Sequence, residues 1–405
     1  MATDGIAICG AGVSGLALAL FLSRAGKRPV IFERFSEPQP VGSGLMLQPT
    51  GLAVMEALGL GQVIRSRGSR IDTILGRDSA SGRTVLDVRY AALGNAGNGL
   101  AVQRAALFDT LWQAVQDAGI EIETGVEVAD IDAGEAASLI DTGGRSRGRF
   151  DLVIDATGAN SHLMGHARYP ARPRPLPFGA WWVTLPWQDE GFDRHALLQR
   201  YRRASVMIGV LPTGDRGKGK GGGMEAAFFW SLRRDQVALQ MAQGLDAWKD
   251  RVTGYWPETR GFLDHVTDFG QLAFAAYGHH TLRVPAGRGI AFVGDAAHST
   301  SPQLGQGANM ALLDAAALAH ALGRFANTEE ALQEYARLRY RHIRLFQAMS
   351  YLFTPFYQSD GVVLPLIRDW LVPPAAQIPL FQRMLARMVS GTFIDPCKGW
   401  ELPKE

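Results

Sequence analysis

Short and long apolar runs alternate at the start of the chain and predict a βαβ unit. The run Gly5–Cys9 has the length of a buried strand, whereas Ser14–Ala25 has alanine and leucine on most faces and predicts a helix that ends at Gly26. A second strand is expected over Arg28–Glu33. A strand, a helix and a strand in this order are typical of a Rossmann-like domain.

The apolar pattern changes texture in the middle of the chain. The first domain is expected to continue with a helix, short strands and a further strand, over residues 100–118, 120–131 and 150–155. From about Pro175 to Val284, tryptophans and alternating apolar positions predict an antiparallel sheet. Strand and helix return over residues 289–322, and the chain from about Glu329 is expected to be helical with proline breaks.

These changes predict an α/β (α+β) fold in which a Rossmann-like nucleotide-binding domain is interrupted by an inserted antiparallel-sheet substrate domain and followed by a helical C-terminal segment. The expected bounds are 1–75, 98–173 and 285–345 for the nucleotide-binding domain, 76–97 and 174–284 for the inserted domain, and 346–405 for the C-terminal segment. The glycine-rich stretch Thr213–Glu225 is expected to form a mobile hairpin tip, with a lid as the alternative.

Composition removes several classes of function. The 405 residues are 47% hydrophobic and 20% charged, with a net charge of +2, so nothing suggests a nucleic-acid footprint. Two separate cysteines, Cys9 and Cys397, do not make a disulfide framework and fit a reducing cytoplasm. No signal peptide is expected, and no apolar run reaches the roughly 20 residues of a spanning helix.

The first candidate site is the turn "GAGVSG" between the first strand and the first helix, with Gly10, Gly12 and Gly15. Glycines at this spacing allow a tight turn, a close approach to a pyrophosphate and close packing of helix on strand. Glu33 ends the second strand, and its carboxylate could accept hydrogen bonds from both ribose hydroxyls of an adenosine. The turn predicts a dinucleotide but does not separate FAD from NAD.

A second glycine-rich turn distinguishes the two cofactors. Asp295 follows the expected strand 289–293 and could bind a second sugar, and Gly305 and Gly307 precede a helix. The N-terminus of that helix would stabilise the negative charge of a reduced flavin, and a nicotinamide ring carries no such charge. One extended FAD would reach from Glu33 to this second turn.

The second turn also carries a family resemblance. Gly294-Asp295-Ala-Ala-His298, Pro302-x-x-Gly305-Gln306-Gly307-x-Asn309 and Asp314-Ala315 resemble the second FAD motif of the single-component FAD-dependent aromatic hydroxylases, the p-hydroxybenzoate hydroxylase-like group A flavoprotein monooxygenases. The segments 41–60 and "VQRAALFDTL" resemble the same family, and the resemblance covers about residues 4–345. It implies FAD as cofactor and NAD(P)H as co-substrate.

The motifs and the resemblance together give a set of expected cofactor-binding residues: Gly10, Gly12, Val13, Ser14, Gly15, Glu33, Arg34, Gly44, Leu45, Arg104, Val128, Asp295, Gly305, Gln306, Gly307, Ala308 and Asn309. The substrate pocket is expected between the flavin and the inserted sheet, lined by Pro302, Trp182, Phe228, Phe229 and Trp230. No catalytic base is identified. No metal site is expected, and the resemblance implies a structural role for His298.

The family's middle motif is incomplete here. Gly158 and Ser161 match it, but Thr157 stands at its aspartate position and Met164 at its arginine position. Losing that cation weakens a handle on an anionic nicotinamide cofactor, so electrons could instead come as reduced flavin from a separate reductase. A flavin-dependent halogenase is disfavoured, because "WWVTLP" lacks the second tryptophan of the halogenase stretch and no lysine occurs between Lys27 and Lys218.

The resemblance implies a monooxygenase that uses O₂, through a C4a-hydroperoxyflavin, to oxygenate an aromatic or related electron-rich, lipophilic small molecule. The alternatives are a two-component oxygenase, a prenyl-reductase-type flavin oxidoreductase without oxygen insertion, and a non-catalytic flavoprotein. A monomer or homodimer in the cytoplasm is expected, with a flavin reductase as a further partner in the two-component case. The apolar tail Ser350–Val389 is expected to cover the core. The alternatives are that it binds a lipophilic substrate, forms a dimer interface or contacts a membrane surface.

Overall fold

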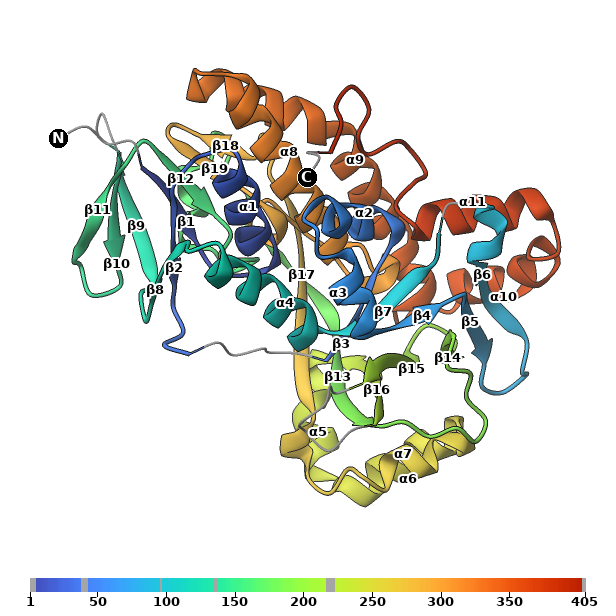
Figure 1. Cartoon of the computed structure of the whole chain (residues 1–405). Coiled ribbons are helices and arrows are strands. Elements are labelled where there is room, and N and C mark those ends of the chain that lie inside the picture. Colours follow the sequence, from blue (N-terminus) through green and yellow to red (C-terminus); the bar gives the residue numbers. More distant parts are fainter. Residues whose placement is uncertain (1–4, 38–42, 95–96, 134–136, 216–222, 403–405) are drawn as a thin grey trace.

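The computed structural model describes residues 5–37, 43–94, 97–133, 137–215 and 223–402. A six-stranded sheet in the order β18-β19-β12-β1-β2-β8 forms the centre of its larger part (Figure 1). All neighbouring strands in it are parallel except β18, which pairs antiparallel with β19 at one edge. The strands are β1 Ile6–Cys9, β2 Pro29–Glu33, β8 Glu121–Thr124, β12 Leu152–Asp155, β18 Ala286–Gly287 and β19 Ile290–Phe292.

Helices cover one face of this sheet and a small sheet covers the other. Ile8 of β1 belongs to the apolar cluster of the helices, whereas its neighbours Ala7 and Cys9 belong to the opposite cluster. Burial on both faces explains why these strands are apolar throughout rather than alternating. The covering elements are α1 Val13–Arg24, α4 Arg104–Asp117 and α8 Gly307–Arg324 on one face, and β9 Val128–Ala133, β10 Ala137–Asp141, β11 Ser146–Phe150 and η2 His162–His166 on the other.

An eight-stranded sheet forms the second part of the fold, in the order β20-β17-β13-β16-β15-β14-β5-β6 (Figure 1). Its neighbours are antiparallel apart from β14 and β5, which are parallel. β5 begins at Thr73, so the boundary expected after residue 75 falls inside this strand. The strands are β5 Thr73–Asp78, β6 Thr84–Arg89, β13 Arg174–Pro186, β14 Ala196–Arg202, β15 Val206–Asp215, β16 Met224–Arg233, β17 Ala273–Thr281 and β20 His298–Ser299.

The sequence prediction for residues 175–284 was right about the strands but missed the helices between β16 and β17. Trp248 and Val252 of α6 are buried against the outer face of the sheet, which this helical layer covers. The tip expected at Thr213–Glu225 joins β15 to β16, and its residues 216–222 lie outside the described part of the chain. The layer comprises η3 Arg234–Gln236, α5 Val237–Ala242, α6 Leu245–Tyr255, η4 Pro257–Thr259, α7 Arg260–Leu263 and η5 Phe269–Gln271.

A three-stranded sheet, β3-β7-β4, connects the two parts. Residues 100–103 belong to β7, so the helix expected over 100–118 begins only at Arg104. The elements here are β3 Gly44–Leu47, α2 Pro49–Ala57, α3 Gly61–Ser66, β4 Gly68–Ile71, η1 Tyr90–Leu93 and β7 Gly99–Gln103.

The C-terminal region is helical, as the sequence predicts, with α9 Thr328–Tyr357, α10 Val363–Ala375 and α11 Pro379–Val389. Pro355 lies in the last turn of α9, and Pro373 and Pro374 lie in the last turn of α10. Pro365 and Pro379 lie in the first turns of α10 and α11. Helices α10 and α11 pack beside β6 of the eight-stranded sheet. Among the described helices none is long and apolar enough to cross a membrane.

Candidate functional site

The predicted cofactor residues gather where the parallel strands end. β1 leads into the turn Gly10–Gly15, β2 ends at Glu33, β12 ends at Asp155, and β19 leads to Asp295. The carboxyl ends of parallel strands lie at one edge of a sheet, which is where open α/β folds bind their ligands. The fold therefore brings the two glycine-rich turns, far apart in the sequence, to one edge.

The first glycine turn meets the geometric demands that its spacing predicts. Gly10 has a φ of +101°, which other residues rarely adopt. A Cβ atom on Gly15 would lie 2.1 Å from the carbonyl oxygen of Gly10, so only glycine lets α1 approach β1 so closely. At Gly12 the nearest atom to an added Cβ would be 3.7 Å away. The protein alone does not require glycine there, and we expect Gly12 to leave room for a ligand.

The N-terminus of α1 adjoins this turn and offers its amide groups to an anion. The helix begins at Val13 and Ser14, its N-cap Gly12 provides no side-chain cap, and its first turn contains no acidic residue. Uncapped amides at the positive end of a helix favour a phosphate. A pyrophosphate could therefore be held mainly by the backbone.

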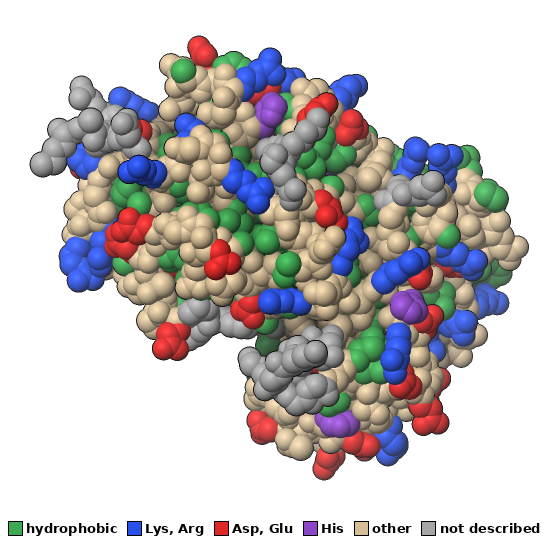
Figure 2. Space-filling model, in the orientation of Figure 1, with side chains coloured by type: hydrophobic (Ala, Val, Ile, Leu, Met, Phe, Trp, Pro, Cys, Tyr) green, Lys and Arg blue, Asp and Glu red, His purple; other side chains and the backbone are tan. Residues whose placement is uncertain are grey.

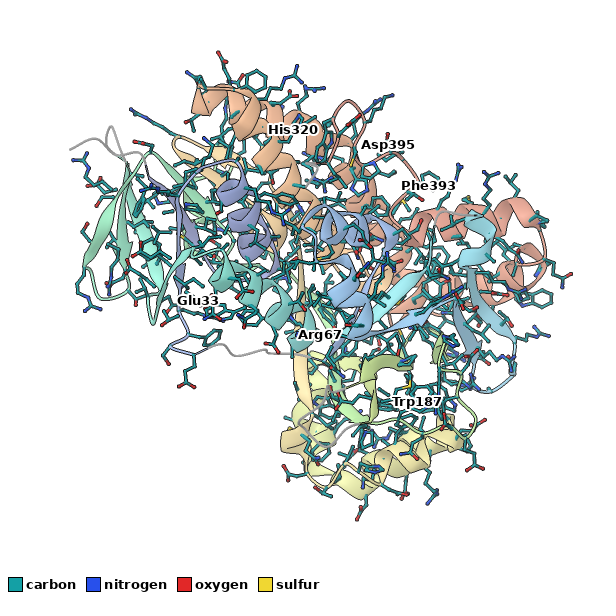
Figure 3. The ribbon with its side chains drawn as sticks, in the orientation of Figure 1. Glu33, Arg67, Trp187, His320, Phe393 and Asp395 are labelled. Atoms are coloured by element: carbon teal, nitrogen blue, oxygen red, sulfur yellow. The ribbon has the colours of Figure 1, made fainter. Side chains whose placement is uncertain are left out.

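Glu33 lies at the end of β2 (Figure 3) and touches the glycine turn directly. Its Oε2 accepts a hydrogen bond from the Ala11 amide at 2.7 Å, and its Oε1 accepts one from the Phe35 amide at 3.1 Å. The carboxylate thus holds the turn, and its remaining lone pairs are available for a ribose. The exposed Arg34 follows, with its guanidinium 4.7 Å from the centre of the Phe35 ring.

The charge of Asp295, in the second turn, interacts with that of Arg104 at the start of α4. Surrounding protein atoms raise the pKa of the Asp295 carboxyl by desolvation, and the charges of His298 and Arg104 oppose this rise. The Asp295 side chain is nevertheless exposed to solvent, and no other described residue forms a hydrogen bond with it. Arg104, at the first position of α4, is also exposed. Both groups are therefore free to bind a ligand.

Helix α8 begins at the second glycine turn, and its first residues have different roles. Gly305 has a φ of +61°, Gly307 starts the helix, and Ala308 lies in the first turn, which has neither an acidic residue nor a side-chain cap. Gln306 and Asn309 are buried. In the segment from Gly305 to Asn309, a flavin could therefore be held by backbone amides rather than by the side chains of Gln306 and Asn309.

The buried side chains of Gln306 and Asn309 fix the turn to distant elements. Asn309 Oδ1 accepts a hydrogen bond from the Gln48 amide at 2.7 Å, and its Nδ2 donates to the Met46 carbonyl at 3.1 Å. The Gln306 Nε2 donates to the carbonyl of Val389. The side chains of these two residues therefore position the turn, and their expected role in binding the cofactor stays a prediction.

Three other predicted cofactor residues lie in the surrounding sheets. A Cβ on Gly44 would lie 2.5 Å from Thr213 and 2.7 Å from Ala227, so this glycine lets β3 pack against the eight-stranded sheet. Leu45 packs partly against the helical core of the first part. Val128 is buried at the start of β9, in the same apolar cluster as Phe32 of β2. None of these contacts identifies a ligand, and their cofactor role stays a prediction.

His298 belongs to a buried ion network. Its Nε2 lies 2.6 Å from Asp314 Oδ2, and Arg339 Nε lies 2.7 Å from Asp314 Oδ1. Burial opposes ionisation of Asp314, but the charges of His298 and Arg339 outweigh it and lower the pKa of this carboxyl. Asp314 Oδ2 also accepts a hydrogen bond from the Gly294 amide at 2.9 Å, so the network holds the second turn in place.

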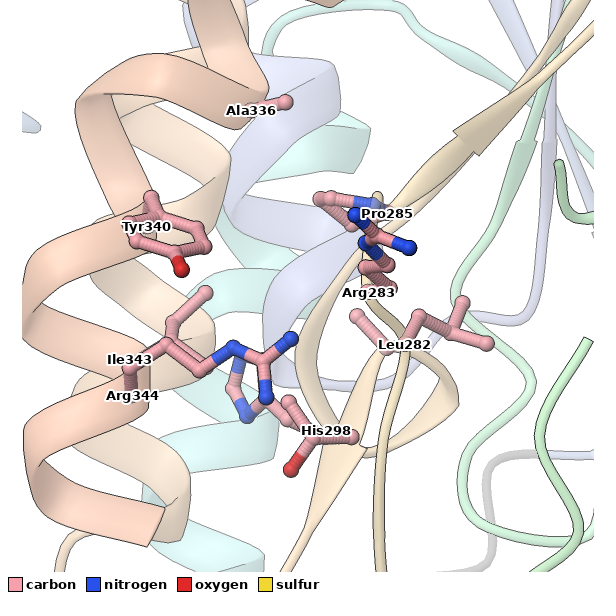
Figure 4. A pocket seen from close by; sticks show the side chains of 10 residues that line it. Leu282, Arg283, Pro285, His298, Ala336, Tyr340, Ile343 and Arg344 are labelled. Carbon is pink, nitrogen blue, oxygen red and sulfur yellow. The ribbon is translucent and has the colours of Figure 1, made fainter. Parts of the chain in front are cut away.

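A small cavity lies on the far side of His298, between α9 and the chain that joins β17 to β18 (Figure 4). None of the predicted cofactor residues lines it. Its lining residues include Leu282, Arg283, Pro285, Tyr340, Ile343 and Arg344.

The incomplete middle motif is divided between the surface and the core, with Thr157 exposed and Met164 buried. Thr157 donates its amide and hydroxyl to Asp155 Oδ1 at 3.0 and 2.7 Å, and Ser161 also donates to Asp155. Met164 is buried in the apolar cluster that contains Cys9 and lines the far face of the central sheet. The position at which the family carries an arginine is therefore a core position in this chain, and it presents no cation.

The aromatic residues of β13 and β16 point to opposite faces of the eight-stranded sheet. Phe228 and Trp230 pack against Trp248 of α6 on the outer face, with ring centres 6.3 and 6.4 Å apart, so the expectation that they line the substrate pocket is wrong. Trp182 and Phe229 lie on the inner face, with ring centres 4.6 Å apart. Strand alternation explains the division, because neighbouring residues of a strand face opposite sides.

The inner face adjoins the second glycine turn. Trp182 packs against an apolar cluster that contains Leu304 and Met310 from this turn and α8, and Ala227 from β16. Pro302 lies half-buried at the start of η7 Pro302–Leu304, just before the turn. Of the predicted pocket residues, Trp182, Phe229 and Pro302 are therefore compatible with a site between sheet and flavin.

The same inner face carries a set of polar side chains that the sequence alone does not indicate. Trp182 Nε1 donates to the Tyr277 hydroxyl at 2.9 Å, and Gln103 Nε2 donates to Thr213 Oγ1 at 2.7 Å. Gln103 also accepts from Thr184 at 3.2 Å. Their signal in the sequence is weak, because a polar residue at an inward position of a strand can be recognised only once the facing of that strand is known.

These features fit FAD. Gly12 leaves space that the protein does not fill, the helices α1 and α8 both begin with uncapped amides, and Asp295 and Arg104 stand free at the same edge. In the described residues no group of three His, Cys, Asp or Glu side chains could hold a metal. The edge is suited to a long ligand with a pyrophosphate between two ends.

Comparison with known proteins agrees with this interpretation. The sequence profile of the family described as "FAD binding domain" matches residues 3–218 and 273–348. The chain is 27% identical over 380 residues to 3-hydroxybenzoate 6-hydroxylase 1 of Aquipseudomonas alcaligenes, covering 88% of this chain and 91% of the relative. It is 30% identical over 356 residues to the phenazine 1,6-dicarboxylic acid hydroxylase PhzS of Lysobacter antibioticus, covering 82% and 86%.

The fold is also that of solved flavoproteins. Klebsiella pneumoniae HpxO, solved with FAD and uric acid, superposes with a TM-score of 0.79 at 19% identity, covering 95% of this chain and 97% of the other. The chain therefore belongs to the FAD-binding-domain family, as an oxidoreductase among the FAD-dependent aromatic hydroxylases of the group A monooxygenases.

Proposed function

We propose that this monooxygenase uses NAD(P)H and inserts one atom of O₂ into an aromatic or related electron-rich small molecule. The observation that supports this most directly is the shared apolar cluster, in which Trp182 of the sheet packs near Leu304 of the second glycine turn. A planar apolar acceptor would bind between these two elements, beside Pro302. The relatives are named as hydroxylases of 3-hydroxybenzoate and of a phenazine dicarboxylic acid, and we propose an acceptor of this broad aromatic class.

Bound FAD supplies the electron transfer and the activation of dioxygen. The chain contributes placement and electrostatics. Amides at the start of α8, from Gly307 onward, would stabilise negative charge on the reduced ring. The guanidinium of Arg104 and the amides around Gly12 would hold the phosphate end. The apolar side chains of Trp182, Phe229 and Leu304 exclude water from the acceptor, which limits wasteful release of peroxide.

Tyr277 is the polar group best placed to orient the acceptor. Its hydroxyl oxygen accepts a hydrogen bond from Trp182, so its own proton remains to be donated. Burial raises the pKa of Tyr277 to about 12, although the bond from Trp182 opposes the rise. The hydroxyl is therefore neutral near pH 7 and would donate to a substrate oxygen instead of acting as a base.

A second candidate function is supported by Met164. Because this side chain is buried where the family carries an arginine, the chain lacks that contact for a nicotinamide cofactor. An oxygenase supplied with reduced flavin by a separate reductase would not need the contact.

Anaerobic reduction separates the two functions. The holoprotein is mixed with NADH or NADPH, alone and with a panel of phenols and quinolines, and the blue absorbance of the flavin is followed. We expect one of the nicotinamide cofactors to bleach the flavin, and one aromatic compound of the panel to accelerate this bleaching. Bleaching by dithionite but by neither nucleotide would contradict the self-contained enzyme and favour the reductase-fed one.

A further inference from the structure

Helix α10 presents an apolar stripe to solvent. Val363, Leu366, Ile367, Trp370 and Leu371 are 67, 48, 42, 72 and 62% exposed. Their spacing of three and four residues is that of the face which a surface helix normally buries. Exposed apolar areas that are contiguous in this way mark interaction sites.

The other face of α10 is anchored, so the stripe cannot turn inward. Arg368 is 3% exposed, and its guanidinium donates to the carbonyls of Phe356 at 2.8 Å and Arg203 at 2.9 Å. The same guanidinium lies 5.2 Å from the ring centre of Tyr201. Breaking these contacts would leave a buried charge unpaired, which is costly. The outward direction of the stripe is therefore built into the fold.

Helix α11 continues the apolar area and adds positive charge. On its outer face, Leu380 is 77% exposed and Met384 is 40% exposed, and the exposed Arg383 and Arg387 alternate with them at helical spacing. Neither arginine forms an ion pair with any described residue. Figure 2 shows Lys and Arg side chains beside apolar ones at this end of the molecule.

The segment of residues 361–392 has almost no compensating negative charge. Its one acidic residue, Asp369, pairs with Arg368 at 2.7 Å. A further cation, Arg83, lies over the ring of Trp370, with 5.8 Å between its guanidinium carbon and the ring centre. Of the cations in this segment, Arg383 and Arg387 are thus left without an acidic partner among the described residues.

We infer that the outer faces of α10 and α11 dock on the surface of an anionic phospholipid bilayer. Apolar side chains such as Trp370 and Leu371 would enter the boundary between headgroups and acyl chains, while Arg383 and Arg387 reach the phosphates. The same charge disfavours a second copy of the chain, because a twofold contact would bring together two surfaces that carry the same positive charge. The inference does not depend on the proposed reaction.

Vesicle flotation with the purified holoprotein tests this inference. The expected result is binding to vesicles of phosphatidylcholine with phosphatidylglycerol, and weak binding to phosphatidylcholine alone. Arg383→Gln with Arg387→Gln should lower the partition coefficient for the anionic vesicles roughly 30-fold, at about 1 kcal/mol for each cation. Trp370→Ser with Leu371→Ser should lower it more than tenfold.

A matched control carries the same type of change elsewhere. Leu239 and Met241 on α5 are 52 and 48% exposed, and replacing both with serine should leave binding unchanged. Flavin absorbance and thermal unfolding verify that each variant is folded. The inference is overturned if the wild-type protein floats with neither vesicle. It is also overturned if the protein forms dimers that Trp370→Ser with Leu371→Ser dissociates, since the occupant would then be a second copy.

Discussion

Replacing Gly15 with alanine tests how closely α1 packs on the first strand. The added Cβ would lie 2.1 Å from the Gly10 carbonyl oxygen, whereas an ordinary contact is at least 3.4 Å. The Cβ of Ala156 would be 3.3 Å away on another side, so the new atom cannot simply tilt aside. The glycine turn and α1 must separate by about 1 Å.

The cost follows from this displacement. Overpacking a close-packed core costs about 1–3 kcal/mol, and we expect the upper end because backbone atoms must move. The apparent melting temperature of the FAD-free protein should fall by about 3–4 °C, because the unfolding entropy of a chain of 405 residues is about 0.85 kcal/mol/K. The same shift misplaces the amides that hold the pyrophosphate. The loss of two such charge-assisted hydrogen bonds should weaken FAD binding roughly 100-fold.

Gly12→Ala provides the contrast. Its Cβ would meet no protein atom closer than 3.7 Å, so the FAD-free protein should lose at most about 1 kcal/mol, mainly through the poorer N-cap. FAD binding should nevertheless weaken roughly 100-fold, because the methyl group occupies the space expected for the pyrophosphate. Gly323→Ala, at an exposed position of α8 with no atom within 4 Å, should be harmless or stabilising by up to about 1 kcal/mol.

Thermal unfolding of the FAD-free proteins and titration of FAD by flavin fluorescence separate these effects. If Gly15→Ala unfolds at the wild-type temperature, the close packing is refuted. If Gly12→Ala binds FAD as tightly as the wild type, the position assigned to the pyrophosphate is wrong.

Three further predictions test other parts of the account. Arg104→Gln should weaken FAD binding about tenfold, which the same titration measures. It should change the stability of the FAD-free protein little, because the Arg104 side chain forms no hydrogen bond or ion pair with any described residue, although its charge acts on Asp295. Burial, reinforced by the charge of Arg339, lowers the pKa of His342 from 6.5 to about 3. The free energy of unfolding should therefore decrease as the pH falls below 6.5, by about 2 kcal/mol at pH 5. Denaturant unfolding of His342→Gln should show a shallower dependence of this free energy on pH, and an unchanged dependence would exclude His342 as the cause. Trp182→Phe should alter substrate KM and increase uncoupled release of peroxide, because this side chain lies on the inner face of the sheet. Trp230→Phe should lower stability and leave the kinetics unchanged, because this side chain packs under α6. Steady-state kinetics and melting curves measure both variants, and an effect of Trp230→Phe on the kinetics with none from Trp182→Phe would contradict the assignment.

The glycine turn and the strands at the cofactor-binding edge of the central sheet could be predicted from local sequence features. Gly10 and Gly15 occupy positions where the backbone conformation or a close contact excludes a side chain, so their spacing carries structural information. The apolar runs of the central strands were equally clear, because both faces are buried. Glu33 was correctly placed at the end of β2 by its position in the sequence, although its bond to the Ala11 amide was not foreseen.

Other features depended on tertiary contacts. The run "LAVQRAALF" contains no Gly or Pro where β7 meets α4, so the change from strand to helix at Arg104 has no local signal. In β16 the run "AAFFW" is apolar on both faces, and only the covering helix α6 shows that Phe228 faces outward. The inward direction of the Asn309 side chain depends on Gln48, which is remote in the sequence.

The most direct test of the central claim is a reaction under dioxygen labelled with ¹⁸O. The holoenzyme is supplied with the reduced nicotinamide and the aromatic compound that accelerate flavin bleaching, and the product is analysed by mass spectrometry. We predict one ¹⁸O atom in the organic product, with the acceptor positioned between Trp182 and the turn that contains Leu304. If all the label appears in peroxide or water and the aromatic compound is recovered unchanged, the chain is not the monooxygenase that we propose.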